Sequence, residues 1–171
     1  MNRRLIGNIA RFILLALAQV YIFNNIQVSG YINPRVYVLF ILMLPYEIAG
    51  FWLLTLAFMM GLTVDFFQHT PGMNASASVF LAFLRPGVIR LVGRKEDLEP
   101  LQYPNIRDSG TGWFLAYTLI LVFLHHLFLF YLEVFRLNEI FQTLLKVLIN
   151  TVLTSLIIML VQFLFFSRKP E

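Results

Sequence analysis

Residues 113–132, WFLAYTLILVFLHHLFLFYL, form a run of 20 residues without an aspartate, glutamate, lysine or arginine. A helix rises about 1.5 Å per residue, so a helix of this length matches the roughly 30 Å hydrocarbon core of a bilayer. The run therefore predicts a membrane-spanning helix. Extended outward along the chain, the same argument predicts four more spans, at residues 9–28, 49–67, 74–92 and 144–166, and a shorter apolar run at 35–46 is the candidate for a sixth.

The composition of the whole chain also indicates a membrane protein. Of the 171 residues, 59% are hydrophobic and 13% are charged, whereas soluble domains average about 45–50% and 25%. Six spans of about 20 residues would use roughly 120 residues, so little is left for a soluble domain. We therefore predict an all-α fold, with a single membrane domain over residues 1–171 and a polar loop at 93–112.

Several classes of chemistry are missing from the sequence. The chain has no cysteine, which excludes disulfides, thiolate catalysis and thiolate metal sites. Nucleotide-binding loops, zinc-protease motifs and serine-hydrolase elbows are also absent. We predict no catalytic residue, metal or cofactor. In a membrane protein, a net charge of +4 reflects the orientation of the chain in the membrane or contact with anionic lipid rather than binding to nucleic acid.

The run at 35–46 is short and ends near Pro45, so alone it could be a re-entrant segment. If it crosses, the basic residues collect on one side of the membrane, as the positive-inside rule requires; otherwise the asymmetry largely collapses. The N-terminal apolar stretch lacks a small-residue cleavage site, which predicts a retained span. We therefore expect six crossings, with both termini and the 93–112 loop in the cytoplasm. The cytoplasmic set is Arg3, Arg4, Arg11, Arg90, Arg94, Lys95, Arg107, Arg168 and Lys169, against Arg35 and Arg136, with Lys146 just inside the last span.

Ionisable residues inside a membrane are costly, which makes them candidates for function. Asp65 and His69 are four residues apart and share a helix face if the helix continues that far. This spacing suits a carboxylate–imidazole hydrogen bond or two metal ligands, but no third ligand is evident. The alternative is a polar helix end at the membrane interface. Asn74 is expected to cap the next helix.

Arg85 precedes Pro86, which is expected to kink the fourth span. One interpretation places Arg85 in the membrane with Asp65 as partner, although 11 residues of helix separate their depths by about 16 Å. The other ends the helix at Pro86 and places Arg85 in a cytoplasmic basic collar. Ser78 and Ala82 share its face at a small-xxx-small spacing that lets helices approach closely.

His125 and His126 lie well inside the fifth span, and Glu133 lies at its outer end. Adjacent histidines on a helix point about 100° apart, so at most one of them faces a given partner. One interpretation is that they form hydrogen bonds between helices; the other is that one of them forms an intramembrane catalytic site with Asp65. The other polar residues of the first and last spans are expected to join helices. They are Gln19, Asn24, Asn25, Asn150, Thr151, Thr154, Ser155 and Gln162.

The order of several short motifs resembles the bacterial rod-shape-determining MreD family, in a Bacteroidota-like branch. The resemblance covers nearly the whole chain. Its motifs are residues 33–40 (NPRVYVLF) with Leu44-Pro45, residues 61–67 (GLTVDFF), residues 71–75 (PGMNA), residues 82–86 (AFLRP), and His125-His126 with Phe130 and Glu133. Asp65, Pro71, Gly72 and Arg85 match the family pattern position by position.

The resemblance implies a non-enzymatic subunit of the cell-wall elongation complex in the bacterial inner membrane. Its implied partners are MreC, the MreB filament, RodA and the transpeptidase partner of RodA. The implied fold is similar to the S components of energy-coupling-factor transporters, and the four matched residues would be structural or interface residues.

From the residues themselves we expect binding through lipid or membrane helices. A groove bordered by Ala75, Ser76, Ser78 and Ala82 would accept a partner's transmembrane helix. The alternative function is a small-ligand-binding membrane component with an outer pocket built from Asp65, His69 and Glu133.

Overall fold

The computed structural model describes residues 3–25, 32–93, 103–134 and 140–166. Within these ranges the elements are all helices. The end of the predicted first span and residues 94–102 of the predicted polar loop lie outside them. The elements are α1 (Arg3–Tyr21), the 3-10 turn η1 (Phe23–Asn25), α2 (Val38–Leu42), α3 (Gly50–Gln68), α4 (Met73–Val92), α5 (Ile106–Ser109), α6 (Thr111–Val134) and α7 (Ile140–Phe166).

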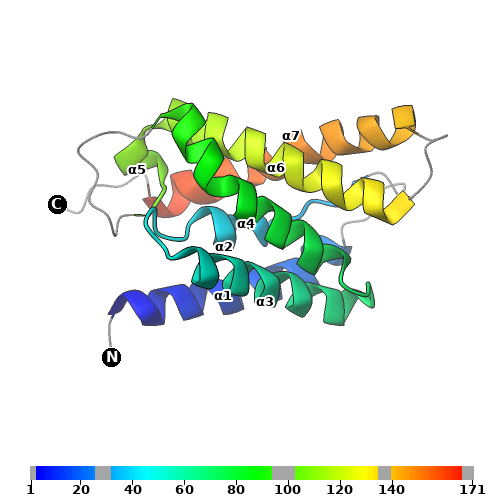
Figure 1. The fold of residues 1–171 in the computed structure, drawn as a ribbon, viewed down its shortest axis with the longest axis horizontal. Helices are drawn as coiled ribbons and strands as arrows, with labels where there is room; N and C mark the ends of the chain where they lie inside the picture. The colour runs from blue at the N-terminus through cyan, green and yellow to red at the C-terminus, as the bar shows by residue number, and fades with distance from the viewer. Residues whose placement is uncertain (1–2, 26–31, 94–102, 135–139, 167–171) are drawn as a thin grey trace.

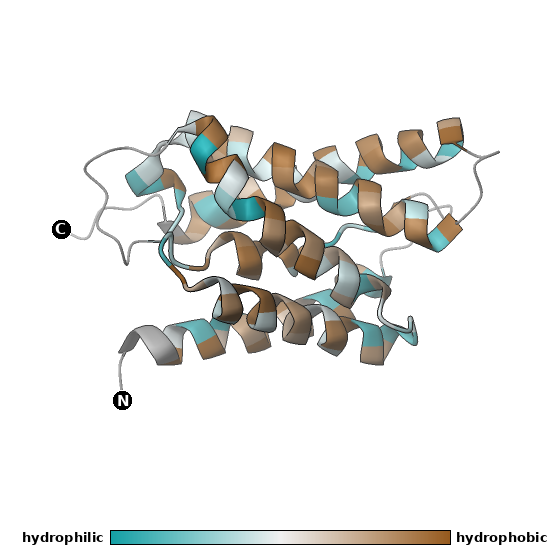
Figure 2. Ribbon diagram, in the orientation of Figure 1, coloured by the Kyte–Doolittle hydropathy of each residue, from teal (hydrophilic) through white to brown (hydrophobic). Residues whose placement is uncertain are grey.

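Five of the described helices are long and apolar enough to cross a membrane, which indicates a multi-pass membrane protein. Figure 2 shows hydrophobic residues predominating along these helices, with hydrophilic residues interspersed. Phe66 is 78% exposed and Phe141 is 86% exposed, whereas Arg85, His125 and Gln162 are fully buried. Soluble proteins rarely expose so much contiguous apolar surface, so this arrangement fits a lipid environment. The five segments are Ile6–Asn25, Gly50–Gln68, Met73–Val92, Thr111–Val134 and Ile140–Phe165.

The long helices form a bundle with two ends (Figure 1). We call the end that holds the start of α1, α3 and α6 the proximal end, and the opposite end the distal end. The helices α4 and α7 run the other way, from the distal end to the proximal end. Because α1 and α3 run in the same direction, the chain between them must return through the bundle. Residues 32–49 make this return.

The predicted second span differs from the others in the structure. Only residues Val38–Leu42 are helical, and Pro34 and Pro45 bracket this short helix. Proline lacks an N–H and disfavours helical backbone in the residue before it, so the two prolines limit the helix on both sides. Every residue from Val36 to Leu44 is at most 3% exposed. Of the short run predicted at 35–46, only five residues are therefore helical, and the segment is a broken one enclosed by the other helices.

The helix α4 continues from Met73 to Val92 through Pro86. Of the two interpretations of Arg85, the one that ends the helix at this proline is therefore wrong, and Arg85 points into the bundle, where it is fully buried. The predicted cap was also wrong, because Asn74 lies inside the first turn and the N-cap residue is Gly72. At Gly72 the backbone φ is +78°, a conformation that glycine adopts without strain.

The helices α3 and α4 approach each other at Gly61. A Cβ atom added to Gly61 would lie 2.5 Å from the Cα atom of Ala75 and 2.5 Å from the backbone oxygen of Asn74. No side chain fits at that distance from another backbone. Gly61 therefore allows the close contact that holds the turn between α3 and α4 in place.

Candidate functional site

A buried glutamine of α1 holds the distal part of the returning segment. Gln19 is fully buried. Its Nε2 donates to the carbonyl oxygen of Pro34 at 3.1 Å, and its Oε1 accepts from the backbone N–H of Tyr37 at 3.3 Å. Non-helical backbone is tolerated at membrane depth only where protein groups satisfy it. Gln19 does so on both sides of Arg35.

Two side chains of α7 hold the same stretch from the opposite side. The backbone N–H of Asn33 donates to Oδ1 of Asn150 at 2.6 Å, and that of Arg35 donates to Oγ1 of Thr154 at 3.2 Å. The sequence indicated that Asn150 and Thr154 join helices. In the structure their partners are the backbone groups that a broken segment leaves unpaired.

Arg85 and Tyr117 hold the proximal part of the returning segment. Nε of Arg85 donates to the hydroxyl oxygen of Tyr117 at 2.8 Å, and this hydroxyl donates to the carbonyl oxygen of Leu42 at 3.0 Å. Both terminal nitrogens of Arg85 lie 3.2 Å from the carbonyl oxygen of Pro45, and Nη2 also donates to that of Leu44. The last carbonyls of a helix lack intrahelical partners and carry partial negative charge, so they suit a buried guanidinium.

Asp65 is not the partner of Arg85, because it lies at the distal end and caps α4. Its Oδ1 accepts from the backbone N–H of Asn74 at 3.0 Å, and its Oδ2 accepts from that of Ala75 at 2.8 Å. Oδ1 also accepts from Nδ2 of Asn74 at 2.9 Å and from the hydroxyl of Thr70 at 2.6 Å. A carboxylate at the start of a helix satisfies free N–H groups and complements the helix dipole.

His69 does not join Asp65 in a site. It is the exposed C-cap residue of α3, with a left-handed backbone at φ 56°. The exposed Pro71 follows in the same turn, before Gly72. Among the described residues, no group of three histidine, aspartate or glutamate side chains is arranged to hold a metal ion. What the turn does is place Asn74 and Ala75 where Asp65 accepts from their backbone N–H groups at the start of α4.

The two histidines of α6 have separate, fully buried surroundings. The hydroxyl of Tyr37 donates to Oδ1 of Asn74 at 3.2 Å, so Nε2–H of His125 donates to the Tyr37 oxygen at 3.0 Å. His126 contacts the carbonyl oxygen of Val122 through Nδ1 at 2.8 Å. His125 thus reaches Asp65 only through two intervening side chains. The two groups do not converge on a space for a substrate, as an intramembrane catalytic site requires.

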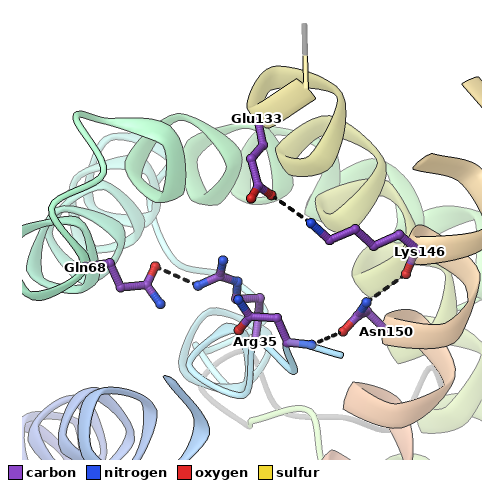
Figure 3. A network of polar contacts seen from close by, with 6 residues as sticks. Arg35, Gln68, Glu133, Lys146 and Asn150 are labelled. Carbon is purple, nitrogen blue, oxygen red and sulfur yellow. Dashed lines mark hydrogen bonds and ion pairs between the residues drawn. The ribbon is translucent and has the colours of Figure 1, made fainter. Parts of the chain in front are cut away.

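A polar cleft of 350 Å³ opens at the distal end, between the ends of α1, α3 and α6. Arg35 reaches into it between Gln68 and Glu133, as Figure 3 shows. Nη1 of Arg35 donates to Oε1 of Gln68 at 2.6 Å, and Glu133 pairs with Nζ of Lys146 at 3.3 Å. The lining consists of Val20, Asn24, Asn25, Asn33, Arg35, Phe67, Gln68, Thr70 and Glu133. Of the three residues predicted for an outer pocket, only Glu133 lines it.

An apolar groove follows the outer face of α3 and α4. It consists of two hollows of 530 and 460 Å³ that share Leu54 and Phe83. The distal hollow is lined by Leu54, Phe58, Leu62, Gly72, Ala75, Ser76, Val79, Phe80 and Phe83. The proximal hollow is lined by Gly50, Leu53, Leu54, Ala82, Phe83, Leu84, Pro86, Gly87 and Arg90. Three of the four predicted groove residues thus border it, whereas Ser78 is fully buried and lines neither hollow.

The sequence did not single out Arg35 and Gln68, whose side chains form a hydrogen bond in the distal cleft. Arg35 was counted only as a basic residue on the outer side, and Gln68 was not singled out. A signal was present for Arg35, since it stands directly between Pro34 and the apolar run that starts at Val36. An arginine at the edge of such a buried run needs hydrogen-bond partners for its guanidinium.

No protein-family model matches this chain, and searches of curated proteins and of solved structures give no significant match.

Proposed function

We propose that this protein is a non-enzymatic scaffold subunit of a bacterial cell-wall elongation complex, similar to MreD. The observation that carries the proposal is the apolar groove on α3 and α4. Its lining follows α4 from Gly72 to Arg90, 18 residues or about 27 Å, which is close to the thickness of the hydrocarbon core. A groove of this length suits one transmembrane helix of a bitopic partner such as MreC.

The shape of the groove supports a helix as its occupant. Small residues at its edge, such as Ser76 and Ala75, let a second helix approach closely, which drives helix association in lipid. Phe83 projects between the two hollows and is 71% exposed. An aromatic ring in the centre of an interface is a typical anchor for binding.

We further propose that the returning segment is the sixth crossing of a bacterial inner membrane, with both termini in the cytoplasm. Two observations support this proposal: α1 and α3 run in the same direction, so the chain must return between them, and buried side chains satisfy the backbone of the returning segment. The proximal end would then face the cytoplasm and present Arg90 and Arg107, both exposed, to anionic lipid or to the MreB filament. RodA and its transpeptidase partner would join the same assembly.

The scaffold is favoured over a small-ligand-binding component of a transporter. That alternative expects Asp65, His69 and Glu133 to line one outer pocket. Asp65 instead has four hydrogen-bond donors around its carboxylate, and His69 does not line the distal cleft.

Crosslinking from matched positions tests the groove. A photocrosslinking amino acid at Phe83 should capture a bitopic membrane protein in the native membrane, whereas the same group at Leu14 should not. Leu14 is a suitable control because it is 65% exposed on α1, outside the groove. The substitution Val79→Trp should fill the groove and reduce capture from Phe83. Equal capture from both positions would contradict the proposal.

Two further measurements test the assembly and the topology. Purification in mild detergent, followed by mass spectrometry, should recover an MreC-like protein with RodA and a transpeptidase; recovery of ATPase subunits would support the transporter alternative. Because the chain lacks cysteine, His69→Cys and Asp108→Cys can report sidedness. An impermeant thiol reagent should label His69→Cys in intact cells and Asp108→Cys only after permeabilisation. Labelling of both from outside would contradict six crossings.

A further inference from the structure

The distal cleft contains a buried positive charge that has no acidic partner in the part of the chain that the structure describes. Arg35 is 5% exposed, and no described carboxylate forms an ion pair with it. Among the described residues, its one side-chain hydrogen bond is the contact from Nη1 to the neutral Gln68, and its buried Nε has no partner there. A buried charge is costly unless it is paired. The contrast with Arg85 is clear, because Arg85 uses all three of its guanidinium nitrogens.

The two acidic groups that the structure describes near Arg35 are already engaged. Glu133 stands at the rim, is 45% exposed and pairs with Lys146. Both oxygens of Asp65 accept from the first turn of α4. Neither carboxylate therefore neutralises the guanidinium by direct contact, and Lys146 offsets the negative charge at the rim. The positive charge of Arg35 is left to face the cleft (Figure 3).

The rest of the lining suits a polar ligand. Four amide side chains and one hydroxyl border the cleft, namely those of Asn24, Asn25, Asn33, Gln68 and Thr70. Amide N–H groups donate hydrogen bonds to anions without adding charge, whereas the hydroxyl of Thr70 already donates to Asp65. Val20 and Phe67 form apolar walls beside them. A volume of 350 Å³ accommodates a small ligand or the headgroup of a lipid.

From this geometry we infer that the distal cleft binds a phosphate group, with Arg35 as its charged anchor. A guanidinium is well suited to phosphate because its planar donors match the oxygens. The phosphate has two sources at this depth: a phosphodiester of a lipid headgroup, or a soluble phosphate compound. Either source would place phosphate oxygens against the guanidinium of Arg35. This inference is independent of the groove on α3 and α4, which lies on another face.

The test uses the full chain, purified in detergent and depleted of lipid. Titration with inorganic phosphate, followed by calorimetry, measures the soluble source. Native mass spectrometry after reconstitution with phosphatidylglycerol measures retained lipid. We expect at least one of the two to bind, and Arg35→Gln to weaken that binding at least about tenfold, since hydrogen bonds to charged groups contribute about 1.5–3 kcal/mol. His69→Asn is the control, because His69 is exposed at the distal end and does not line the cleft.

A second pair of variants covers the case in which Arg35→Gln does not fold. Val20→Trp should fill the cleft from its apolar wall and abolish binding. Leu17→Trp lies about one turn earlier on α1, is 46% exposed and does not line the cleft, so it should bind as the parent does. Retention by phosphatidylglycerol alone identifies a lipid site, and binding of inorganic phosphate alone identifies a soluble ligand. Absence of both, or equal binding by Val20→Trp and Leu17→Trp, would overturn the inference.

Discussion

Both terminal nitrogens of Arg85 lie 3.2 Å from the carbonyl oxygen of Pro45, although 40 residues separate them in the chain. The contact joins the middle of the fourth span to the end of the broken segment. It replaces the hydrogen bond that a continuous helix would have given this carbonyl. The stability of the bundle should therefore depend on Arg85 through the backbone that it holds.

Replacement of Arg85 by alanine is expected to destabilise the protein by about 3 kcal/mol or more. It leaves the carbonyls of Leu44 and Pro45 and the hydroxyl of Tyr117 without their partner, and each buried unpaired group costs about 1–3 kcal/mol. Thermal unfolding in detergent measures the loss. Arg90→Ala is the control, because Arg90 is exposed and, among the described residues, its side chain bonds the carbonyl of Pro86 within its own helix. Equal loss in both variants would show that Arg85 belongs to a general basic collar.

Replacement of Asp65 by alanine should destabilise the start of α4 by about 2 kcal/mol, as the loss of a strong helix cap does. Hydrogen exchange of the backbone N–H groups of Asn74 and Ala75 measures the effect locally. His69→Asn is the matched control, since asparagine tolerates the left-handed backbone at this exposed position. If Asp65 and His69 formed one site, the two variants would behave alike.

Replacement of Gly61 by alanine should destabilise the protein by about 1–3 kcal/mol, because the added methyl group meets the backbone of α4. Gly87→Ala offers a direct comparison within a helix. Its added methyl group meets nothing within 4 Å, so it should be neutral or stabilise by up to about 1 kcal/mol. Similar melting temperatures for the two variants would contradict the close packing of α3 and α4.

The contact between Tyr37 and His125 should appear as a coupling in a double-mutant cycle. Tyr37→Phe removes a partner from His125 and from Asn74, which should cost about 2 kcal/mol. His125→Leu removes the other partner, and the combined variant should lose less than the sum of the two single changes. Tyr21→Phe, at a residue that is 67% exposed, should have little effect. Strict additivity would show that the two side chains act independently.

The candidate residues were partly recognisable from their types. An arginine before a proline and an aspartate near a helix end were conspicuous in an apolar chain, and both are buried in the structure. Their partners were not recognisable. The sequence suggested Asp65 for Arg85, yet each binds backbone groups instead, and backbone groups leave no mark in a sequence. The same is true of Gln19 and Thr154.

The sequence by itself determined the class of the protein and its long helices. A run of apolar residues as long as a bilayer is thick is a local property, which requires no knowledge of the rest of the chain. The four later long helices begin and end within four residues of the predicted spans. Only the tertiary structure decided that residues 35–46 form a broken, enclosed segment. Its backbone is stable only because side chains from α1, α4, α6 and α7 supply the hydrogen bonds that water and a regular helix would otherwise provide.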